Sequence, residues 1–448
     1  MIITSLAIKP VSHPLHATVR VPGSKSLTNR ALLIASLANG TTRLTNALFS
    51  DDSHYFAKAL QTLGFDVQLD EAHHEMTVIG QGGHIPAKKA ELFIGNAGTA
   101  ARFLSAFLTL GHGEYILDGD ARMRERPIGD LIDALHQLGV EIDALDSLSP
   151  RERAGVRAVC PPIEISANGL RGGKTKIVGN ISSQFLSALL MVAPYAQSPI
   201  EIELTTDLNS KPYVDLTIST MRDFGVEIER EGYRSFRIPI TNYEARVTYP
   251  IESDASAATY FFAAPAICSG TVRVENISRK SKQGDIAFLK ILEKMGCQIK
   301  DGEDYIEVTG TGELNGVDVD LRDIPDTAQT LAVIAPFAAS PTRIRGIASA
   351  RVKETDRVSA TCTELKRLGV QVEEHEDGMT IHPCKTFQPF DCEALRAAPS
   401  NIQTYNDHRM AMAFSLIGLR IDGITIENPA CVSKTFPNFF EVLDSLRG

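Results

Sequence analysis

One short pattern of apolar and polar positions recurs along this chain of 448 residues. Apolar residues at helical spacing are followed by a glycine, and an alternating apolar stretch begins directly after it. Each copy predicts the end of a helix, a glycine just beyond it and the start of a strand. Close copies occupy 60–67 (LQTLGFDV), 135–142 (LHQLGVEI), 221–228 (MRDFGVEI), 292–299 (LEKMGCQI) and 365–372 (LKRLGVQV).

The spacing of these copies indicates an internal repeat. Their glycines, at 64, 139, 225, 296 and 369, are separated by 75, 86, 71 and 73 residues. A degenerate sixth copy (LDSLRG) ends the chain, 79 residues after the fifth glycine. Helix–glycine–strand junctions are common in any α/β protein, but five close copies at nearly even spacing favour six small α/β units.

Three copies precede residue 250 and three follow it, so we predict two lobes of three units each. Residues 19–24 (VRVPGS) lead into the first unit and residues 249–254 (YPIESD) into the fourth, and the prolines of both segments mark the expected crossings between lobes. We predict one lobe from residues 23–252. Residues 1–22 and 253–448 form the other, discontinuous lobe, which includes the N-terminal strand.

In the first lobe, predicted helices begin with small polar residues and continue as apolar runs. These starts are PGSKSLTNR (22–30), GNAGTAAR (95–102) and GNISSQ (179–184). A helix N-terminus offers unpaired N–H groups and the positive end of the dipole, so such a start can bind an anion. An ordinary capping role explains each segment equally well, and GSKS is not a Walker loop.

In the second lobe, the corresponding helix starts carry an acid, namely Asp254, Asp326 and Asp407. Most such aspartates are helix caps. An acid that faces several cations could instead serve as a base, and Asp326 is the candidate for that role.

The densest run of charge is RVKETDR at residues 351–357. On a helix, Lys353 and Arg357 share a face with Glu354 beside them, which suits an anionic substrate held by two cations while a carboxylate moves a proton. The alternative is a solvated helix start with ion pairs. Further cations lie in RMRERP (122–127) and at Lys434, and both segments lead into a proline near a turn or helix start.

Composition limits the partners. A net charge of −10 argues against nucleic acid and anionic membranes, but not against small anionic substrates, which respond to local charge. The seven cysteines include no C-x-x-C pair, so they indicate neither zinc nor disulfides and fit a reducing compartment. The N-terminus lacks a signal-peptide pattern, and no apolar run has membrane-spanning length. We therefore expect a cytoplasmic protein without nucleic-acid or membrane partners.

Together these segments resemble the EPSP synthase family, the 5-enolpyruvylshikimate-3-phosphate synthases among the enolpyruvyl transferases. The resemblance runs from the first strand to Lys434, through motifs at 22–30, 95–102, 122–127, 182–184, 210–213, 351–357, 405–409 and 434–437. It implies a two-lobed, inside-out α/β barrel of six βαβαββ units, with the active site in the cleft between lobes. It also implies a monomer that uses no metal or organic cofactor. Its reaction would transfer the enolpyruvyl group of phosphoenolpyruvate to the 5-hydroxyl of shikimate 3-phosphate and release phosphate.

Matching the family motifs residue by residue assigns the substrate contacts. The resemblance implies that shikimate 3-phosphate contacts Lys25, Ser26, Arg30, Ser182, Ser183, Gln184, Ser210, Tyr213, Asp326, Ser349 and Lys353. It places phosphoenolpyruvate against Lys25, Gly98, Arg126, Gln184, Arg357, Arg409 and Lys434. In catalysis, Asp326 would be the base for the 5-hydroxyl, with Lys25 able to share that role. Glu354 would protonate the methylene carbon, with His408 close by.

The implied reaction explains why so many cations occur among the matched residues. Two multiply charged anions repel each other, so fixed cations must neutralise them, and a buried carboxylate can stabilise the cation-like carbon that forms at C2. Burial would favour the protonated form of Glu354, whereas Lys353 and Arg357 would favour its carboxylate. The sequence leaves open which effect wins.

Two positions depart from the family pattern. Ser349 stands where the family commonly has asparagine, which removes, shortens or hydrates one substrate hydrogen bond. Phe103 stands where many members have proline, on the helix that carries Gly98. The added bulk and backbone N–H would shift that helix start. Because Gly98 is retained, we predict at most partial tolerance of glyphosate, the family's phosphonate inhibitor.

Three other functions are compatible with parts of this sequence, and each is disfavoured by a particular feature. The sister family that transfers enolpyruvyl to UDP-N-acetylglucosamine carries a reactive cysteine in the loop of its second unit, and residues 111–126 contain none. A non-catalytic phosphometabolite-binding protein would not need both Asp326 and Glu354. A nucleic-acid-processing protein is disfavoured by the acidic charge and by the lack of aromatic platforms.

Overall fold

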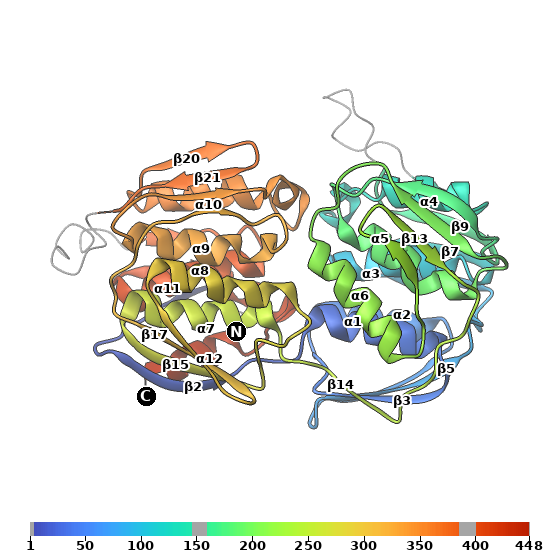
Figure 1. Ribbon diagram of the computed structural model, residues 1–448, viewed down its shortest axis with the longest axis horizontal. Coiled ribbons are helices and arrows are strands. Elements are labelled where there is room, and N and C mark those ends of the chain that lie inside the picture. The colour runs from blue at the N-terminus through green and yellow to red at the C-terminus, as the bar shows by residue number, and fades with distance from the viewer. Residues whose placement is uncertain (1–3, 146–158, 385–399, 448) are drawn as a thin grey trace. The chain divides into compact units, whose positions relative to one another are not determined.

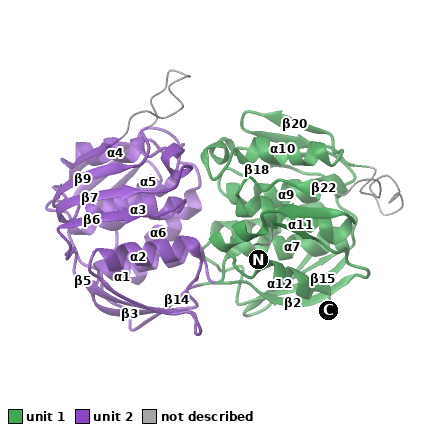
Figure 2. Cartoon of the chain, turned by 180° about the vertical axis from the view of Figure 1, so that it is seen from behind, with its two compact units in different colours: residues 1–22, 252–448 green, residues 23–251 purple. Residues whose placement is uncertain are grey.

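The computed structural model covers the whole chain, and the structure describes residues 4–145, 159–384 and 400–447. The chain forms two compact units (Figure 2). Unit 1 comprises Met1–Pro22 and Glu252–Gly448, and unit 2 comprises Gly23–Ile251. None of the described helices is both long and apolar enough to span a membrane.

The described residues of unit 2 form three four-stranded sheets and six α-helices, most of which are labelled in Figure 1. The helices are α1 (Lys25–Leu37), α2 (Asp51–Thr62), α3 (Gly98–Leu108), α4 (Gly129–Gln137), α5 (Ser183–Val192) and α6 (Lys211–Asp223). The sheet β14-β3-β5-β4 consists of β3 (Asn39–Thr45), β4 (Asp66–Asp70), β5 (Glu75–Gln81) and β14 (Thr248–Pro250). The sheet β6-β7-β9-β8 consists of β6 (Lys89–Phe93), β7 (His112–Asp118), β8 (Glu141–Ala144) and β9 (Ile163–Asn168). The sheet β10-β11-β13-β12 consists of β10 (Gly173–Ile177), β11 (Ile200–Leu204), β12 (Glu229–Glu231) and β13 (Ser235–Ile238).

Unit 1 is built in the same way. Its helices are α7 (Ala255–Cys268), α8 (Phe288–Met295), α9 (Ala328–Ile334), α10 (Arg357–Arg367), α11 (His408–Arg420) and α12 (Phe439–Asp444). The sheet β16-β17-β15-β2 consists of β2 (Leu15–Arg20), β15 (Gly270–Glu275), β16 (Gln298–Asp301) and β17 (Tyr305–Gly310). The sheet β18-β19-β21-β20 consists of β18 (Asp318–Asp320), β19 (Thr342–Arg345), β20 (Val372–His375) and β21 (Gly378–Ile381). The third sheet has three strands, β1 (Ser5–Ala7), β22 (Ser400–Ile402) and β23 (Ile424–Glu427).

Burial separates the helices of each unit into two kinds. Almost every side chain of α1, α3 and α5 in unit 2, and of α7, α9 and α11 in unit 1, is buried. The other helices bury one face, as α2 and α4 do. The strands mostly alternate buried and exposed residues, so each sheet offers one apolar face to the helices. The α/β prediction is therefore confirmed, with the fully buried helices inside each unit and the sheets outside (Figure 1), and no sheet among the described residues closes into a barrel.

The repeated glycines end helices, as predicted. Helices α2, α4, α6, α8 and α10 stop one or two residues before Gly64, Gly139, Gly225, Gly296 and Gly369, and a strand starts soon after each glycine. All five glycines have positive φ, between 80° and 111°. This left-handed conformation turns the chain at low cost only for glycine, which explains why the repeat is visible in the sequence.

Two strands join segments that are far apart in the chain. β2 pairs in parallel with β15, and β14 pairs in parallel with β3. The chain thus leaves unit 1 after Pro22 and returns to it at Glu252. Within unit 1, the amide of Asp254 donates to the carbonyl of Pro22 at 2.8 Å. Within unit 2, Gly23 lies so close to Asn46 that an added Cβ would meet the Asn46 carbonyl oxygen at 1.8 Å.

Candidate active site

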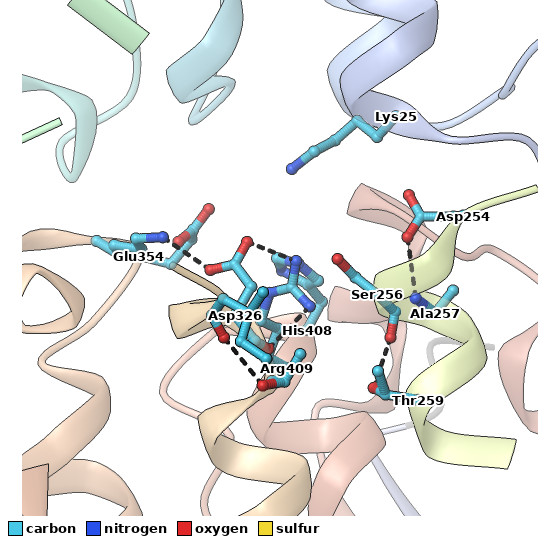
Figure 3. Close-up of polar contacts among 12 residues, drawn as sticks. Lys25, Asp254, Ser256, Ala257, Thr259, Asp326, Glu354, His408 and Arg409 are labelled. Carbon is cyan, nitrogen blue, oxygen red and sulfur yellow. Dashed lines mark hydrogen bonds and ion pairs between the residues drawn. The ribbon is translucent and has the colours of Figure 1, made fainter. Parts of the chain in front are cut away.

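In unit 1, the predicted site residues lie at the starts of inner helices and in the loop before α10. Asp326 belongs to the 3-10 turn η5 (Pro325–Thr327), just ahead of α9. His408 and Arg409 begin α11, and Lys434 ends the 3-10 segment η9 (Pro429–Lys434). Figure 3 shows Asp326, Glu354, His408 and Arg409 drawn together by these elements.

Asp326 lies among three cations. Its Oδ1 atom is 2.7 Å from Lys353 Nζ and 3.1 Å from Arg357 Nη1, and its Oδ2 atom is 2.8 Å from Arg409 Nη2. Burial raises the pKa of Asp326, but the charges of Arg409, Lys353 and Arg357 outweigh it and hold that pKa well below its ordinary value. Asp326 is therefore a carboxylate with low basicity for as long as these cations face it.

Arg357 is the most enclosed of these cations. Its Nε atom donates to Asp407 Oδ2 at 2.7 Å, and its Nη2 atom donates to Glu354 Oε2 at 2.8 Å. The Arg357 side chain is 3% exposed and Asp407 is fully buried, so little solvent screens this pair. Burial lowers the pKa of Arg357, whereas Asp407, Glu354 and Asp326 raise it, and the net shift is upward. Asp407 also caps α11 by accepting from the Arg409 amide at 2.9 Å.

Glu354 has a second cation nearby. Lys434 Nζ lies 3.9 Å from Glu354 Oε1, and both side chains are mostly buried. The Nδ1 atom of the buried His408 lies 3.6 Å from Asp407 Oδ1. Burial also lowers the pKa of Lys353. Every cation of this group faces a carboxylate, so an incoming anion has to compete with Asp326 and Glu354 for them.

One local expectation is wrong. Lys353 does not share a helix with Arg357, because α10 begins only at Arg357, after the cap residue Asp356. Lys353 follows the 3-10 segment η7 (Ala348–Val352) with φ −90° and ψ −146°, outside helical geometry. The two cations still converge, since both contact Asp326. Ser349 lies half-buried within η7.

In unit 2, the predicted residues gather at the starts of α1, α3, α5 and α6. Lys25 opens α1, and its Nζ atom is 3.3 Å from Oδ2 of the buried Asp52. Arg30 lies one turn further on and donates to Thr217 Oγ1 at 2.7 Å, to the Ser26 carbonyl at 2.9 Å and to the Tyr213 carbonyl at 3.1 Å. Its guanidinium is buried, which lowers the pKa of Arg30 to about 10.

The departure at Phe103 bears directly on Arg30. The Arg30 guanidinium carbon lies 5.2 Å from the centre of the Phe103 ring, within cation–π range. Phe103 is fully buried in α3. Phe103, which replaces the family's proline, therefore packs against the guanidinium of Arg30, a predicted substrate-binding residue.

Gly98 and Arg126 form a tight pair. A Cβ placed on Gly98 would lie 2.4 Å from Arg126 Nη2, so the guanidinium occupies the space that a side chain would need. Arg126 Nη1 also donates to the carbonyl and the side-chain oxygen of Asn96, at 3.1 and 3.0 Å. Arg102 instead links the start of α3 to the 122–127 segment, because it donates to the carbonyls of Gly98 and Pro127.

The remaining predicted residues provide amide and hydroxyl groups. Ser182 caps α5 by accepting from the Gln184 amide at 3.3 Å, and Gln184 Nε2 lies 3.4 Å from Thr99 Oγ1. Ser183 is buried in the first turn of α5. Ser210 has a left-handed backbone (φ 57°) just before α6, whose first turn holds Tyr213.

Sequence reasoning missed the residues that hold the cations. Asp52, Asn96, Thr217 and Phe103 each contact a predicted substrate cation but were assigned no such role. Thr217 and Phe103 contact Arg30 from other repeats. Asp52 and Asn96 contact their cations within one repeat but from a different helix or loop, so no local spacing in the chain connects the partners. Asp407 was visible as a helix cap, but its pairing with Arg357, 50 residues earlier, was not.

Solved structures similar to the chain define its class. EPSP synthase from Acinetobacter baumannii matches with a TM-score of 0.77 at 25% identity, over 99% of this chain and 98% of that one. The enolpyruvyl transferase NikO from Streptomyces tendae matches with a TM-score of 0.74 at 17% identity, over 99% of this chain and 97% of that one, which shows the fold alone. The fold is that of the enolpyruvyl transferases.

Sequence comparison narrows the class to one family. A family model described as EPSP synthase (3-phosphoshikimate 1-carboxyvinyltransferase) matches residues 10–443. The 3-phosphoshikimate 1-carboxyvinyltransferase of Nostoc punctiforme is 48% identical over 436 residues, 97% of both chains, and that of Sulfurovum sp. is 48% identical over 444 residues, 99% of both. The chain belongs to the EPSP synthase family.

Proposed function

We propose that this chain transfers the enolpyruvyl group of phosphoenolpyruvate to the 5-hydroxyl of shikimate 3-phosphate and releases phosphate, using the residues described above. This reaction leads toward chorismate and the aromatic amino acids. Family membership identifies the reaction. The observation that supports the residue assignment is the cluster of Lys353, Arg357 and Arg409 around one carboxylate, Asp326.

Phosphoenolpyruvate is bound by cations that now face carboxylates. Arg357, Arg409 and Lys434 of unit 1 receive its phosphate and carboxylate groups, together with Lys25, Arg126 and Gln184 of unit 2 beside Gly98. Shikimate 3-phosphate binds to the predicted side chains at the starts of α1, α5 and α6, and also to Ser349, Lys353 and Asp326. Fixed cations offset the repulsion between the two anions, and within each unit their geometry is set before the substrates arrive.

Binding of phosphoenolpyruvate changes the basicity of Asp326. When a substrate anion takes over Arg357 and Arg409, Asp326 loses two of the three cations that keep its pKa low. Its carboxylate then becomes a better acceptor for the proton of the 5-hydroxyl, with Lys25 able to share the role. Asp326 is thus activated as a base once phosphoenolpyruvate is bound.

Addition and elimination complete the reaction. A proton passes from Glu354 to the methylene carbon of phosphoenolpyruvate, the 5-oxygen bonds to C2, and its proton goes to Asp326. In the elimination step the methyl group returns a proton to the Glu354 carboxylate, the bond between C2 and the phosphate oxygen breaks, and the phosphate leaves with the proton that Asp326 had accepted. The cation-like C2 formed during addition is stabilised by the Glu354 carboxylate, while the buried His408 lies near the same helix start.

The proposal requires residues of both units to contact the same substrates, so substrate binding has to bring the units together. Small-angle scattering tests this requirement. We expect the radius of gyration to fall when shikimate 3-phosphate and phosphoenolpyruvate are added together. An unchanged radius with both sites saturated would contradict closure.

We further propose that the enzyme acts as a monomer in the cytoplasm. The seven cysteines without pairing motifs support a reducing compartment, and one chain supplies every assigned substrate contact. Light scattering after size exclusion tests the monomer at the concentration used for kinetics, and a mass of two chains would overturn it. Fractionation of the source cells tests the location, and recovery with the membranes would count against it.

Phosphate release measured with a chelator present tests the reaction itself. We expect release only when shikimate 3-phosphate and phosphoenolpyruvate are both added, and none when UDP-N-acetylglucosamine replaces the acceptor. Glu354→Gln should bind both substrates with little turnover. Binding of both substrates by the parent without any phosphate release would favour a non-catalytic phosphometabolite-binding protein.

A further inference from the structure

The 351–357 segment contains two charged residues for which the proposed reaction has no use. Arg351 and Asp356 flank the stretch that carries Lys353 and Glu354, and the side chain of Arg351 contacts backbone carbonyls outside this segment. Its Nε atom donates to the Glu376 carbonyl at 2.9 Å, and its Nη2 atom donates to the His375 carbonyl at 2.7 Å. Arg351 therefore joins this segment to the turn between β20 and β21.

The third nitrogen of Arg351, Nη1, links the two ends of the 351–356 loop to each other and to β20. Nη1 lies 2.9 Å from Asp356 Oδ2 and 2.8 Å from Glu374 Oε1. Asp356 is also the cap of α10, since its Oδ1 atom accepts from the Ser359 amide at 3.0 Å. One guanidinium thus binds the loop at the cap of α10 and fixes it to a strand of the outer sheet.

Lys353 and Glu354 lie between these two anchored ends. Lys353 has an irregular backbone conformation (φ −90°, ψ −146°) rather than a helical one, so no helical hydrogen bonds set its direction. Its Nζ atom nevertheless reaches Asp326 at 2.7 Å, and Glu354 Oε2 accepts from Arg357 at 2.8 Å. The position of both side chains therefore depends on how firmly the loop ends are held.

We propose that Arg351 is a positioning residue, which holds the loop so that Lys353 reaches shikimate 3-phosphate and Glu354 reaches the methylene carbon. This inference rests on the proposed function and adds to it a residue that contacts neither substrate. The planar guanidinium supplies donors in three directions at fixed angles, which a lysine ammonium at the same place cannot reproduce. A displacement of about 1 Å in a positioned catalytic group can cost about 100-fold in rate.

Substitution of Arg351 gives a graded test. Arg351→Met removes all the contacts and should lower kcat about 100-fold and raise the KM for shikimate 3-phosphate. Arg351→Lys keeps the charge near Asp356 but loses carbonyl contacts, so it should recover part of the loss. The KM for phosphoenolpyruvate should change less, because Arg409 and Lys434 belong to other segments.

Asp356→Asn tests the closure of the loop without loss of the helix cap, since asparagine caps helices about as well as aspartate. It weakens the pairing with Arg351 and should reproduce part of the Arg351→Met defect. The two substitutions together should cost less than the product of their separate effects, because both disrupt one contact.

Arg279 provides the matched control. Like Arg351, it follows an interior strand of a four-stranded sheet, and it binds two carboxylates, with Nε 2.8 Å from Asp301 and Nη2 2.5 Å from Glu293. No predicted site residue lies in its loop. Arg279→Met should therefore lower stability without changing either KM or the kcat per folded molecule.

The outcomes separate this inference from the proposed function. A parent enzyme that releases no phosphate refutes the proposed function, whatever the variants do. If the parent is active and folded Arg351→Met has the same kcat and KM as Arg279→Met, the positioning role is refuted. A lower kcat with a higher KM for shikimate 3-phosphate, partly recovered in Arg351→Lys, supports it.

Discussion

The contact between Gly98 and Arg126 permits a quantitative prediction for Gly98→Ala. The new methyl carbon would lie 2.4, 2.7 and 2.8 Å from Nη2, Cζ and Nη1 of Arg126. Carbon needs a separation of about 3.5 Å from such atoms, so the guanidinium has to retreat by about 1 Å. The backbone itself accepts alanine, because Gly98 is the first residue of α3 and has no positive φ. The effect should therefore fall on Arg126 and not on folding.

The size of the effect follows from the bond that Arg126 is expected to make. A charge-assisted hydrogen bond contributes about 1.5–3 kcal/mol, and a retreat of the donor by about 1 Å removes most of it. Since 1.4 kcal/mol corresponds to a factor of ten, the KM for phosphoenolpyruvate should rise by about 10- to 100-fold. The KM for shikimate 3-phosphate should stay within about twofold, because its contacts at α1 and α6 do not involve Gly98.

Steady-state phosphate release with each substrate varied in turn measures both KM values. Gly129→Ala is a suitable control: it also places alanine at a helix start, where the nearest atom, Val159 Cβ, is 3.3 Å away. It should leave both KM values unchanged. An unchanged KM for phosphoenolpyruvate in a stably folded Gly98→Ala variant would show that Arg126 does not bind this substrate.

Three further predictions concern Asp326 and Phe103. Asp326→Asn should lower kcat by at least about 100-fold and destabilise unit 1 by about 3 kcal/mol, because three cations lose the Asp326 carboxylate. In thermal unfolding, inorganic phosphate should stabilise this variant more than the parent. Equal stabilisation would contradict the idea that a substrate anion replaces Asp326 at these cations. Because the folded-state pKa of Asp326 is lowered, its contribution to stability is full above the unfolded pKa of about 3.9 and is lost as the pH falls toward the folded pKa. Urea unfolding should therefore give a constant difference in unfolding free energy between the parent and Asp326→Asn from about pH 5 to 7. A difference that vanishes by about pH 6 would refute the lowered pKa of Asp326. Phe103→Pro should bind glyphosate more tightly, because the start of α3 shifts, and should bind shikimate 3-phosphate more weakly, because Arg30 loses its contact with the aromatic ring. Glyphosate inhibition equal to that of the parent would show that Phe103 does not affect tolerance.

The parts of the fold that could be predicted are those encoded locally. A glycine with positive φ at each helix end, such as Gly296 with φ 111°, tolerates little substitution, so the repeat stays visible in the sequence. The pairing of strands is different, because it joins distant segments through apolar faces that many strands share. The pairing of β1 with β23 in the sixth unit had no local signal.

The same distinction applies to the candidate site. Charged residues that gather at helix starts could be recognised from the sequence, because a helix start restricts which residues fit there. Their partners could not: Arg30 is held by Thr217 on another helix, and the loop of Lys353 is held by backbone carbonyls, which every residue possesses. The helix expected to carry both Lys353 and Arg357 fails because Asp356 caps α10 first.

The order of synthesis gives the pairing of β2 with β15 a further meaning. The ribosome makes β2 before any of unit 2, and β15, the partner of β2, emerges only after all of unit 2 has been translated. Unit 2, in contrast, ends with its own missing strand, β14, and can complete its sheets before unit 1 has a core. Unit 2 is thus an uninterrupted insertion whose flanking residues, Pro22 and Asp254, are one hydrogen bond apart in the host unit. A short linker at that point would let unit 1 be produced as one continuous chain, as unit 2 already is.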